Sequence, residues 1–398
     1  MPAETAGASA LEARRAFSQT HRQMDMRQTS VFGSTMKKYF FTIFPAVIMI
    51  IVFGASSKGG NACFETIRVA AEAYLGSGRP LDIDAKALYE SMVSSMALRD
   101  VRNYDPSSFK RGPIIVDLRA PDPEMPHPYA VGHIPGAVHI PLRNITDWKY
   151  LMDLPKDRKI VVYSATGQVG GQAAAILNLL GYDAVNLKWG MTAWAARSDV
   201  APGRYESSRD TVWRSGGSYR TVERLNSPRE TYDFPNFENG NGRDNFETIL
   251  SAGRLYFNAL DKPFTISAPE LDVLLRSSEN PYVVPLVLDV RDEAAYRLGH
   301  IDKCLHIPLR ALFRRENLRH LPPDRQIVVY CETGHESAQA VAVLNLLGYD
   351  AVSLKWGIAA WSLSLPGSDI APNRYDERRD CMGYEVVTGF RSFIPCPG

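Results

Sequence analysis

The chain has little of what marks several classes of protein. Its 398 residues carry a net charge of +1, and no basic stretch is interleaved with aromatic residues. This balance argues against a nucleic-acid-binding protein. The five cysteines are scattered and the eight histidines are not clustered, so the spacing typical of a zinc site is absent. With 45% hydrophobic residues, the composition is that of an ordinary globular protein.

Long hydrophobic runs are also scarce. The basic pair Lys37 and Lys38 precedes an uncharged run over residues 39–54, YFFTIFPAVIMIIVFG, and small residues follow it. This order is typical of a secretory signal. The run is shorter than the about 20 apolar residues that a transmembrane helix needs. Three alternatives stay open: a cleaved signal, a retained signal anchor that tethers the protein to a membrane, and lipid attachment at Cys63.

All three alternatives place the rest of the chain in the periplasm or otherwise outside the cytoplasm. Met36 stands immediately before the two lysines, which indicates that translation could begin there. We therefore interpret residues 1–35 as an uncertain N-terminal extension and residues 36–60 as a signal peptide or signal anchor.

The remainder of the chain is an internal repeat. LNLLGYDAVNLKWG begins at Leu177 and LNLLGYDAVSLKWG begins at Leu344, in a register of 167 residues. A repeat of this length predicts two domains with separate cores. We assign the first domain to residues 64–206 and the second to residues 246–398. The polar segment 207–245 between them is interpreted as a linker with little core of its own.

Each copy alternates strand and helix patterns. In the second copy, residues 286–290, 326–330 and 349–354 are apolar runs typical of buried strands, and residues 337–347 have helical spacing. Such alternation predicts an α/β fold in which a mainly parallel sheet is flanked by helices. Sites in these folds lie at the carboxyl ends of the strands, and the second of these strands leads directly to Cys331.

The two copies differ at the residue that would carry the chemistry. In the repeat register YSATGQVG lies over YCETGHES, so that Ser164 stands where the second copy has Cys331. Gly334 permits a sharp turn into the following helix, and the amides of that turn can converge on the sulfur. The turn would lower the pKa of the thiol and stabilise a thiolate or a persulfide. The loop predicted to do so consists of Glu332, Thr333, Gly334, His335, Glu336 and Ser337.

Taken together, the motifs of both copies resemble the rhodanese-like family. The strand-Cys-x-x-Gly-x-x-Ser-helix pattern is preceded by Asp289-x-Arg291 and by the His-Ile-Pro motif of residues 299–308, and residues 354–361 follow with Leu-Lys-Trp-Gly and Trp. The resemblance implies two tandem rhodanese-like domains, of which the first is inactive and the second is a sulfurtransferase.

In this interpretation Cys331 carries sulfur as a persulfide, and no cofactor or metal is expected. The partners implied are a small sulfur donor, such as thiosulfate, a polysulfide or a persulfide, and an acceptor that is a thiol or a protein sulfur carrier. The alternative is a non-catalytic binding or scaffold protein of the cell envelope. A related cysteine phosphatase is disfavoured because Ser337 stands where that chemistry needs an arginine to grip phosphate.

The loop departs from the family in its charge. Many members have a cation there, whereas this loop carries Glu332 and Glu336. Each carboxylate would raise the pKa of the thiol and repel an anionic donor by about 1 kcal/mol at an effective dielectric constant near 20. A neutral or protein-bound donor is therefore favoured over thiosulfate. His335 is expected to pack in the loop or to face solvent; alternatively, when protonated, it would offset part of this charge.

Other residues have plainer explanations. We expect Asp289 and Arg291 to form a structural ion pair between the sheet and the loop. His300 and His306 recur in the copy that lacks the thiol, which favours a structural role for both.

The remaining cysteines and the repeated tryptophans are not candidates for catalysis. Cys304 is expected to pack in the core. Cys381 and Cys396 could form a disulfide in an oxidising compartment. Trp189 and Trp356 stand at matching places and are expected to anchor the core.

Overall fold

The computed structural model describes residues 62–96, 101–105, 112–121, 126–210, 219–226, 230–236, 244–259, 262–276, 284–362 and 371–389. These residues belong to one compact unit, Gly54–Gly398. The predicted signal segment 36–60, the extension 1–35 and Cys396 lie outside the described residues, and so do the expectations that depend on them. Within the ranges given above, no helix has the length and apolar character needed to cross a membrane.

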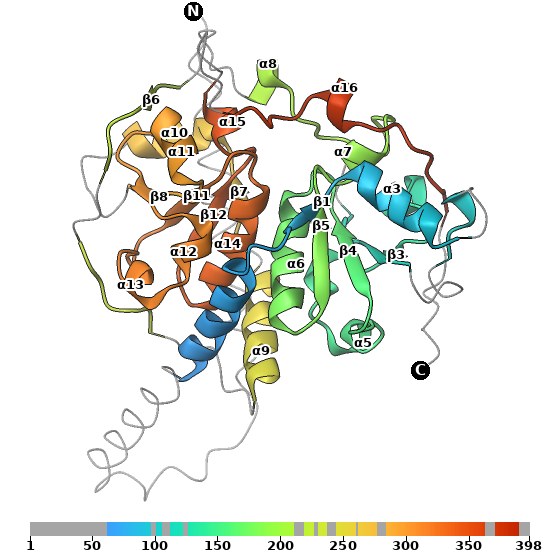
Figure 1. Ribbon diagram of the computed structural model, residues 1–398, viewed down its shortest axis with the longest axis horizontal. Helices are drawn as coiled ribbons and strands as arrows, with labels where there is room; N and C mark the ends of the chain where they lie inside the picture. The colour runs from blue at the N-terminus through green and yellow to red at the C-terminus, as the bar shows by residue number, and fades with distance from the viewer. Residues whose placement is uncertain are drawn as a thin grey trace, which may run out of the picture. The chain divides into compact units, whose positions relative to one another are not determined.

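The first repeat is built on a five-stranded sheet with the order β1-β5-β4-β2-β3, in which every pair of neighbours is parallel (Figure 1). Its strands are β1 (Asp82–Ile83), β2 (Ile114–Asp117), β3 (Val138–His139), β4 (Lys159–Tyr163) and β5 (Asp183–Leu187). A helix over residues 62–75 comes first. The others are α3 (Ala85–Ser94), η1 (Val101–Asn103), α4 (Pro128–Val131), η2 (Leu142–Asn144), α5 (Trp148–Leu151), α6 (Gln168–Leu179), α7 (Met191–Trp194) and α8 (Ser207–Asp210).

The second repeat has the same topology. Its parallel sheet has the order β10-β8-β11-β12-β7. The strands are β7 (Thr265–Ile266), β8 (Leu286–Asp289), β10 (Leu305–His306), β11 (Ile327–Tyr330) and β12 (Ala351–Leu354), and β9 (His300–Ile301) lies apart from this sheet. The helices are α9 (Asn245–Asn258), α10 (Ala268–Arg276), α11 (Glu293–Leu298), α12 (Leu309–Leu312), α13 (Arg315–Leu318), α14 (His335–Leu346), α15 (Ile358–Trp361) and α16 (Glu377–Asp380). The predicted α/β class with two mainly parallel sheets is confirmed.

The central β-α-β unit follows from local sequence. Strand β11 is a run of β-branched residues ending in tyrosine and is buried along its whole length, as expected for a central parallel strand. Gly334, with φ of 88°, turns the chain from this strand into α14. Because the turn is so tight, the helix begins at His335, two residues before the predicted start. Gly348, with φ of 92°, follows its end.

Helix α14 packs against α6, its counterpart in the first repeat, and the two repeats share one buried hydrophobic cluster. The helix that opens each repeat also contacts the other repeat. Arg68 donates to the carbonyl of Phe313 at 3.1 Å, and Arg254 donates to the carbonyl of Thr146 at 2.9 Å. The sequence repeats as two units, but these helices are exchanged across the boundary.

The segment interpreted as a linker is partly integrated into the second repeat. Strand β6 (Thr221–Val222) pairs antiparallel with β9. The amide of Tyr219, whose side chain is buried, donates to the carbonyl of Trp361 at 2.9 Å. In the same manner the C-terminal tail returns to the first repeat, where the amide of Met382 donates to the carbonyl of Ala193 at 2.8 Å.

Candidate functional site

Cys331 lies at the carboxyl end of β11, where the sequence placed it, with a side chain that is only 2% exposed. Its Sγ accepts a hydrogen bond from the amide of Gly334 at 3.1 Å. The amide of Ile358, at the start of α15, donates to the Cys331 carbonyl at 3.0 Å and holds the loop from behind. The residues 332–337 thus form an amide cradle around the sulfur.

The electrostatics of the cradle differ from the sequence-based expectation of a lowered pKa. Burial raises the pKa of the Cys331 thiol above its ordinary value, and the charge of Glu336 raises it further. The hydroxyl and amide of Ser337 and the amide of Thr333 oppose this shift by favouring the thiolate. The predicted net lowering was wrong because desolvation of the enclosed sulfur outweighs the converging amides.

Ser337 is supported by a residue that sequence reasoning missed. Its Oγ lies 2.9 Å from Oγ of Ser353 on β12, and both side chains are fully buried. In the first repeat the matching positions are Gly170 and Asn186, so the hydroxyl pair is lost together with the thiol. The replacement of both serines in the copy that lacks the thiol is the sequence signal that could have identified Ser353. The pair orients the Ser337 hydroxyl toward Cys331.

The first repeat keeps the cradle without the sulfur. The Oγ of Ser164 accepts hydrogen bonds from the amides of Gly167 at 3.0 Å and Gly170 at 3.2 Å. The amide of Met191 donates to the Ser164 carbonyl at 2.9 Å, as Ile358 does to Cys331. The two loops therefore have the same backbone architecture, and they differ in whether a thiol occupies the centre.

Comparison with known proteins also finds a duplication. The model of the rhodanese-like domain matches the chain twice, over residues 99–197 and 270–364. The chain belongs to the rhodanese-like family. Each match falls within one of the two predicted domains, so both repeats are rhodanese-like domains.

Curated relatives include proteins named as sulfurtransferases. Over 266 residues the chain is 29% identical to a putative thiosulfate sulfurtransferase, SseA, of Mycobacterium tuberculosis, covering 58% of this chain and 79% of that one. Over 78 residues it is 37% identical to a sulfurtransferase of Allochromatium vinosum, covering 19% and 71%. It is 43% identical over 77 residues to the probable adenylyltransferase/sulfurtransferase MoeZ of Mycobacterium tuberculosis, covering 19% of this chain and only 20% of that relative.

The two rhodanese-like loops face each other. Gln168 Nε2 donates to the carbonyl of Thr333 at 3.4 Å, and at the matching place His335 Nε2 lies 3.2 Å from the carbonyl of Thr166. Trp189 and Trp356 meet across the same boundary with ring centroids 5.9 Å apart. Both tryptophans are buried, as expected of core anchors. The core in which they pack lies between the two domains.

His335 is not a cation that offsets the acidic loop. It is buried, and burial together with the charge of Lys188 lowers its pKa to about 3. The amide of Trp189 donates to Nε2 at 3.1 Å, and Nδ1 lies 3.0 Å from Oγ1 of Thr333. The suggested charge compensation was wrong because a neutral ring is what this enclosed position accommodates.

Replacing His335 with glutamine is expected to weaken the acid sensitivity of the fold. The pKa of this histidine is about 6.5 in the unfolded chain and about 3 in the folded protein. Protonation of His335 therefore does not reduce the free energy of unfolding above pH 6.5, and it reduces it progressively as the pH falls below 6.5. The slope from this residue is about 1.4 kcal/mol per pH unit. Glutamine is the residue of the first repeat at this place, Gln168. Thermal unfolding from pH 6.5 to about 5 should show a shallower decline in H335Q. An unchanged slope would contradict the assignment.

The two carboxylates of the loop have different roles. Glu332 is held by the C-terminal tail, since the backbone amide and the side-chain amide of Asn373 donate to its oxygens at 2.6 and 2.8 Å. Glu336 is the carboxylate whose charge raises the pKa of Cys331. Desolvation raises the pKa of Glu336 itself, Lys188 opposes this, and Glu332 adds to it.

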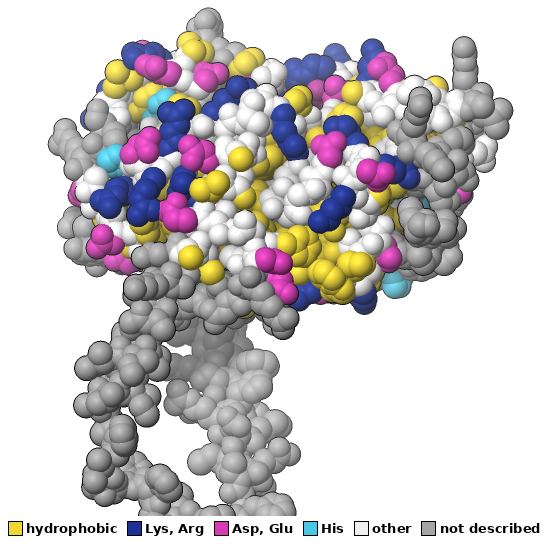
Figure 2. Space-filling model, turned by 60° about the horizontal axis from the view of Figure 1, so that its bottom comes forward, with side chains coloured by type: hydrophobic (Ala, Val, Ile, Leu, Met, Phe, Trp, Pro, Cys, Tyr) yellow, Lys and Arg dark blue, Asp and Glu magenta, His cyan; other side chains and the backbone are white. Residues whose placement is uncertain are grey.

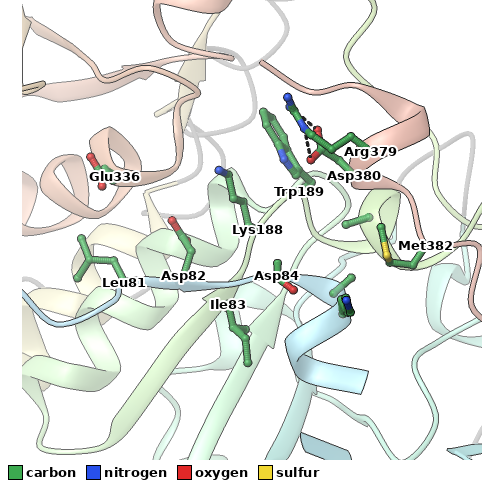
Figure 3. Close-up of a pocket in the computed structure, with 13 residues that line it drawn as sticks. Leu81, Asp82, Ile83, Asp84, Lys188, Trp189, Glu336, Arg379, Asp380 and Met382 are labelled. Carbon is green, nitrogen blue, oxygen red and sulfur yellow. Dashed lines mark hydrogen bonds and ion pairs between the residues drawn. The ribbon is translucent and has the colours of Figure 1, made fainter. Parts of the chain in front are cut away.

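Beside the cradle lies a pocket of about 560 Å³ that the first domain helps to line (Figure 3). Asp82, Lys188 and Trp189 come from that domain, and Glu336 lies across from them. Burial raises the pKa of Asp82 to about 7; Asn186, which donates to it at 2.7 Å, and Lys188 oppose the shift, whereas Glu336 adds to it. Sequence reasoning missed Asp82 and Lys188 because nothing in the repeat indicates which first-domain side chains face the second.

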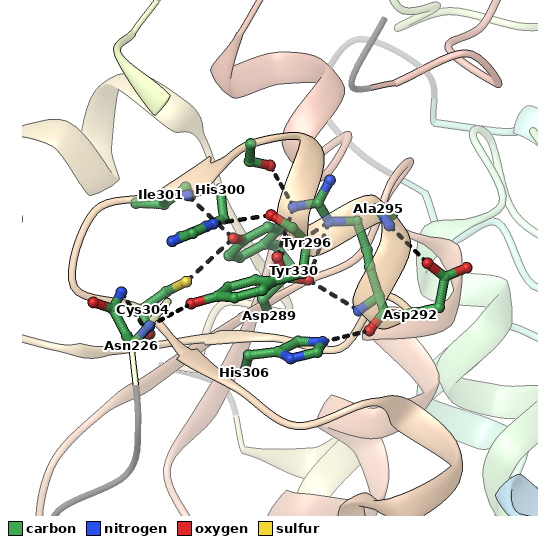
Figure 4. Close-up of polar contacts among 12 residues, drawn as sticks. Asn226, Asp289, Asp292, Ala295, Tyr296, His300, Ile301, Cys304, His306 and Tyr330 are labelled. Atoms are coloured by element: carbon green, nitrogen blue, oxygen red, sulfur yellow. Dashed lines mark hydrogen bonds and ion pairs between the residues drawn. The ribbon is translucent and has the colours of Figure 1, made fainter. Parts of the chain in front are cut away.

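Asp289, labelled in Figure 4, forms the expected ion pair with Arg291, whose Nη2 lies 2.7 Å from Oδ2 of Asp289. Both are buried, and Arg291 also donates to the carbonyl of Gly299 at 2.8 Å. The rings of His300 and His306 stack on Tyr296, with centroids 3.8 and 4.2 Å away. These contacts tie the strand end to the following segments and involve no group of the cradle.

The remaining cysteine expectations concern Cys304 and Cys381. Cys304 is buried, its Sγ lies 3.4 Å from the hydroxyl of Tyr330, and burial raises its pKa to about 12. It packs in the core as predicted. The proposed partner of Cys381 lies outside the described residues. Among the side chains that the structure describes, no cluster of histidine, cysteine, aspartate and glutamate could hold a metal ion.

Gly334→Ala is expected to destabilise the protein more than an alanine substitution at another glycine with a positive φ. At φ of 88° an alanine costs about 1–2 kcal/mol in backbone strain alone. Its Cβ would also lie 2.8 Å from Nε2 of Gln168 and 3.0 Å from the amide of Trp356. Gly181 has the same φ with nothing within 4 Å, so Gly181→Ala is the matched control. Equal losses in the two variants, measured by chemical denaturation, would show that the interdomain contact is unimportant.

Proposed function

We propose that this protein is a sulfurtransferase whose second rhodanese-like domain carries sulfur as a persulfide on Cys331. The observation that carries the proposal is the amide of Gly334 at 3.1 Å from Sγ, in a cradle whose counterpart holds the hydroxyl of Ser164. A hydroxyl neither ionises near neutral pH nor accepts a sulfur atom reversibly, so the first domain serves as a partner without turnover. The names of the relatives support sulfur transfer in general.

The reaction has two displacements. In the first, the Cys331 thiolate attacks the outer sulfur of a donor, a new S–S bond forms, and the donor's S–S bond breaks as its leaving group takes the electron pair. In the second, an acceptor thiolate attacks the outer sulfur of the persulfide and Cys331 leaves as a thiolate. Amides of the cradle stabilise the negative sulfur in both steps. Neither step needs a cofactor.

The charges around the thiol favour a particular class of donor. Glu336 disfavours an approaching dianion such as thiosulfate, and Glu332 lies in the same loop. The adjoining pocket, of about 560 Å³, offers more room than thiosulfate needs. We therefore infer that the preferred donor carries less negative charge than thiosulfate, as a small-molecule persulfide or a protein-bound persulfide does. The acceptor is a small thiol or a protein sulfur carrier.

Intact mass spectrometry of the reduced protein tests this proposal. The chain is exposed to thiosulfate and, separately, to a small-molecule persulfide. The expected result is a gain of one sulfur atom, larger with the persulfide, that cyanide removes. Cys304→Ala should retain the gain, because that thiol is buried with a pKa near 12. No gain from either donor in a folded sample would overturn the proposal.

The enclosure of the thiol supports a second candidate, a binding or scaffold protein without turnover. Cys331 is 2% exposed, and its raised pKa leaves less thiolate at neutral pH than an ordinary cysteine has. The same mass measurement separates the two functions. A binding protein would remain unmodified by either donor, whereas a sulfurtransferase gains and loses one sulfur.

A further inference from the structure

Two large apolar side chains stand exposed at one end of the first domain. Trp148 on α5 is 51% exposed, and Met152, one helical turn later, is 64% exposed. Leu151 between them is buried. Figure 2, which brings the bottom of Figure 1 forward, shows hydrophobic side chains gathered on this side of the molecule. Exposed apolar groups of this kind are typical of a contact surface.

The internal repeat shows that the fold does not require them. In the second domain the matching short helix is α13, where Arg315 and Arg319 replace the tryptophan and the methionine. The buried leucine is kept: the hydroxyl of Tyr182 donates to the carbonyl of Leu151 at 2.8 Å, and the equivalent bond in the second domain is 3.1 Å. The same local structure therefore forms with arginines at both exposed positions.

These two short helices adjoin the beginning of the helix over residues 62–75. On one side, Trp148 packs edge-on against Phe246 with ring centroids 5.9 Å apart, and the neighbouring Asn245 accepts a hydrogen bond from Thr66 at 3.3 Å. On the other side, Arg315 forms an ion pair with Glu65. An apolar surface and a basic surface thus lie on either side of the point where the chain enters the domain pair.

The chain upstream of this point contains the uncharged run 39–54. Seven residues separate its end from Ala62, and the eight steps between these two Cα atoms span at most about 28 Å when fully extended. Any surface that holds the run therefore also holds this end of the domain pair close by. A run of this character is suited to a lipid bilayer, whether as an anchor or during export.

We propose that the face formed by Trp148, Met152, Arg315 and Arg319 rests on an anionic lipid bilayer. Tryptophan is favoured at the boundary between headgroups and acyl chains, and an apolar methionine can enter it. The arginines on the other side of the entry point attract anionic headgroups.

The geometry of the sheets gives this contact an orientation. Tyr182 stands immediately before β5, so its bond to Leu151 places α5 at the amino ends of the strands. Cys331 lies at the carboxyl ends, and so do Lys188 and Glu336, which line the neighbouring pocket. A bilayer at the α5 side therefore leaves the pocket mouth directed toward water, where a soluble donor and acceptor have access.

Photocrosslinking of the full chain in vesicles tests the contact. A benzophenone amino acid replaces Met152 in one sample and, as the matched control, Leu298 on α11, which is 52% exposed. The vesicles contain phosphatidylcholine with phosphatidylglycerol, and a second set lacks the anionic lipid. We expect a lipid adduct from position 152, several-fold less from position 298, and a lower yield from position 152 without phosphatidylglycerol.

Four outcomes would overturn the proposal. They are equal adducts from both positions, no adduct from position 152 in vesicle-bound protein, failure of the chain to associate with vesicles, and crosslinks from position 152 to residues 39–54 or to a second copy. A Trp148→Arg, Met152→Arg variant, which copies α13, should unfold at the same temperature. It should also load sulfur as before, so failure of the surface and failure of the sulfur chemistry remain distinguishable.

Discussion

Cys331→Ser is expected to reduce sulfur transfer to the background level while the fold is retained. The change removes the nucleophile and acceptor atom of both displacement steps, and no other described thiol sits in an amide cradle of this kind. The magnitude should be at least about a thousandfold in kcat/KM, comparable to removing a nucleophile from other covalent enzymes. Steady-state transfer from polysulfide to a small thiol provides the measurement.

The first domain shows why this variant should fold. Ser164 occupies the equivalent cradle, with hydrogen bonds of 3.0 and 3.2 Å from two loop amides. A serine at position 331 therefore has a structural precedent within the same chain. Unfolding temperatures of the variant and the unaltered protein should agree closely. Substantial transfer by a folded Cys331→Ser protein would remove Cys331 from the mechanism.

Glu336→Arg is expected to raise kcat/KM for thiosulfate by roughly tenfold or more. Eliminating one negative charge near the thiol contributes about 1 kcal/mol, and adding a positive charge contributes a similar amount. The substitution removes the carboxylate that raises the pKa of Cys331, so the pKa should fall and more thiolate should be present at neutral pH. The pH at which thiosulfate turnover reaches half its maximum should move downward for the same reason.

Two controls separate the loss of the negative charge from the gain of a positive charge, and the change in thiol pKa from the repulsion of the donor. Glu336→Gln removes charge without reversing it, and its gain should be about half as large on a logarithmic scale. A neutral donor reports only the change in thiol pKa, so its gain should be smaller than that for thiosulfate. If Glu336→Arg leaves thiosulfate turnover unchanged or lowers it, the carboxylate is not the barrier to this donor.

Much of the architecture was predictable because it depends on short-range patterns. The buried strand β11, the helix α14 after Gly334 and the stop at Gly348 are each encoded within a few residues. The repeat then supplied the domain organisation and the contrast between Ser164 and Cys331. The start of α14 differed by two residues because the turn at Gly334 is tighter than the helical periodicity alone indicates.

The sign of the pKa shift at Cys331 was not predictable in this way. Converging amides can be inferred from a local motif, but desolvation depends on everything that encloses the sulfur. His335 illustrates the same limit. Its neutral state follows from burial against Trp189 and Thr166, which lie 146 and 169 positions away in the other domain.

The duplicated α/β fold, the position of the thiol at a strand end and the serine at the matching place in the first domain follow from the sequence, because local periodicity and comparison of the two copies reveal them. Only the three-dimensional packing shows that the opening helices and tails are exchanged, and that Asp82 and Lys188 of the first domain line the pocket beside the Cys331 loop. Such contacts join residues far apart in the chain. Their charges and burial depend on packing that no local pattern records.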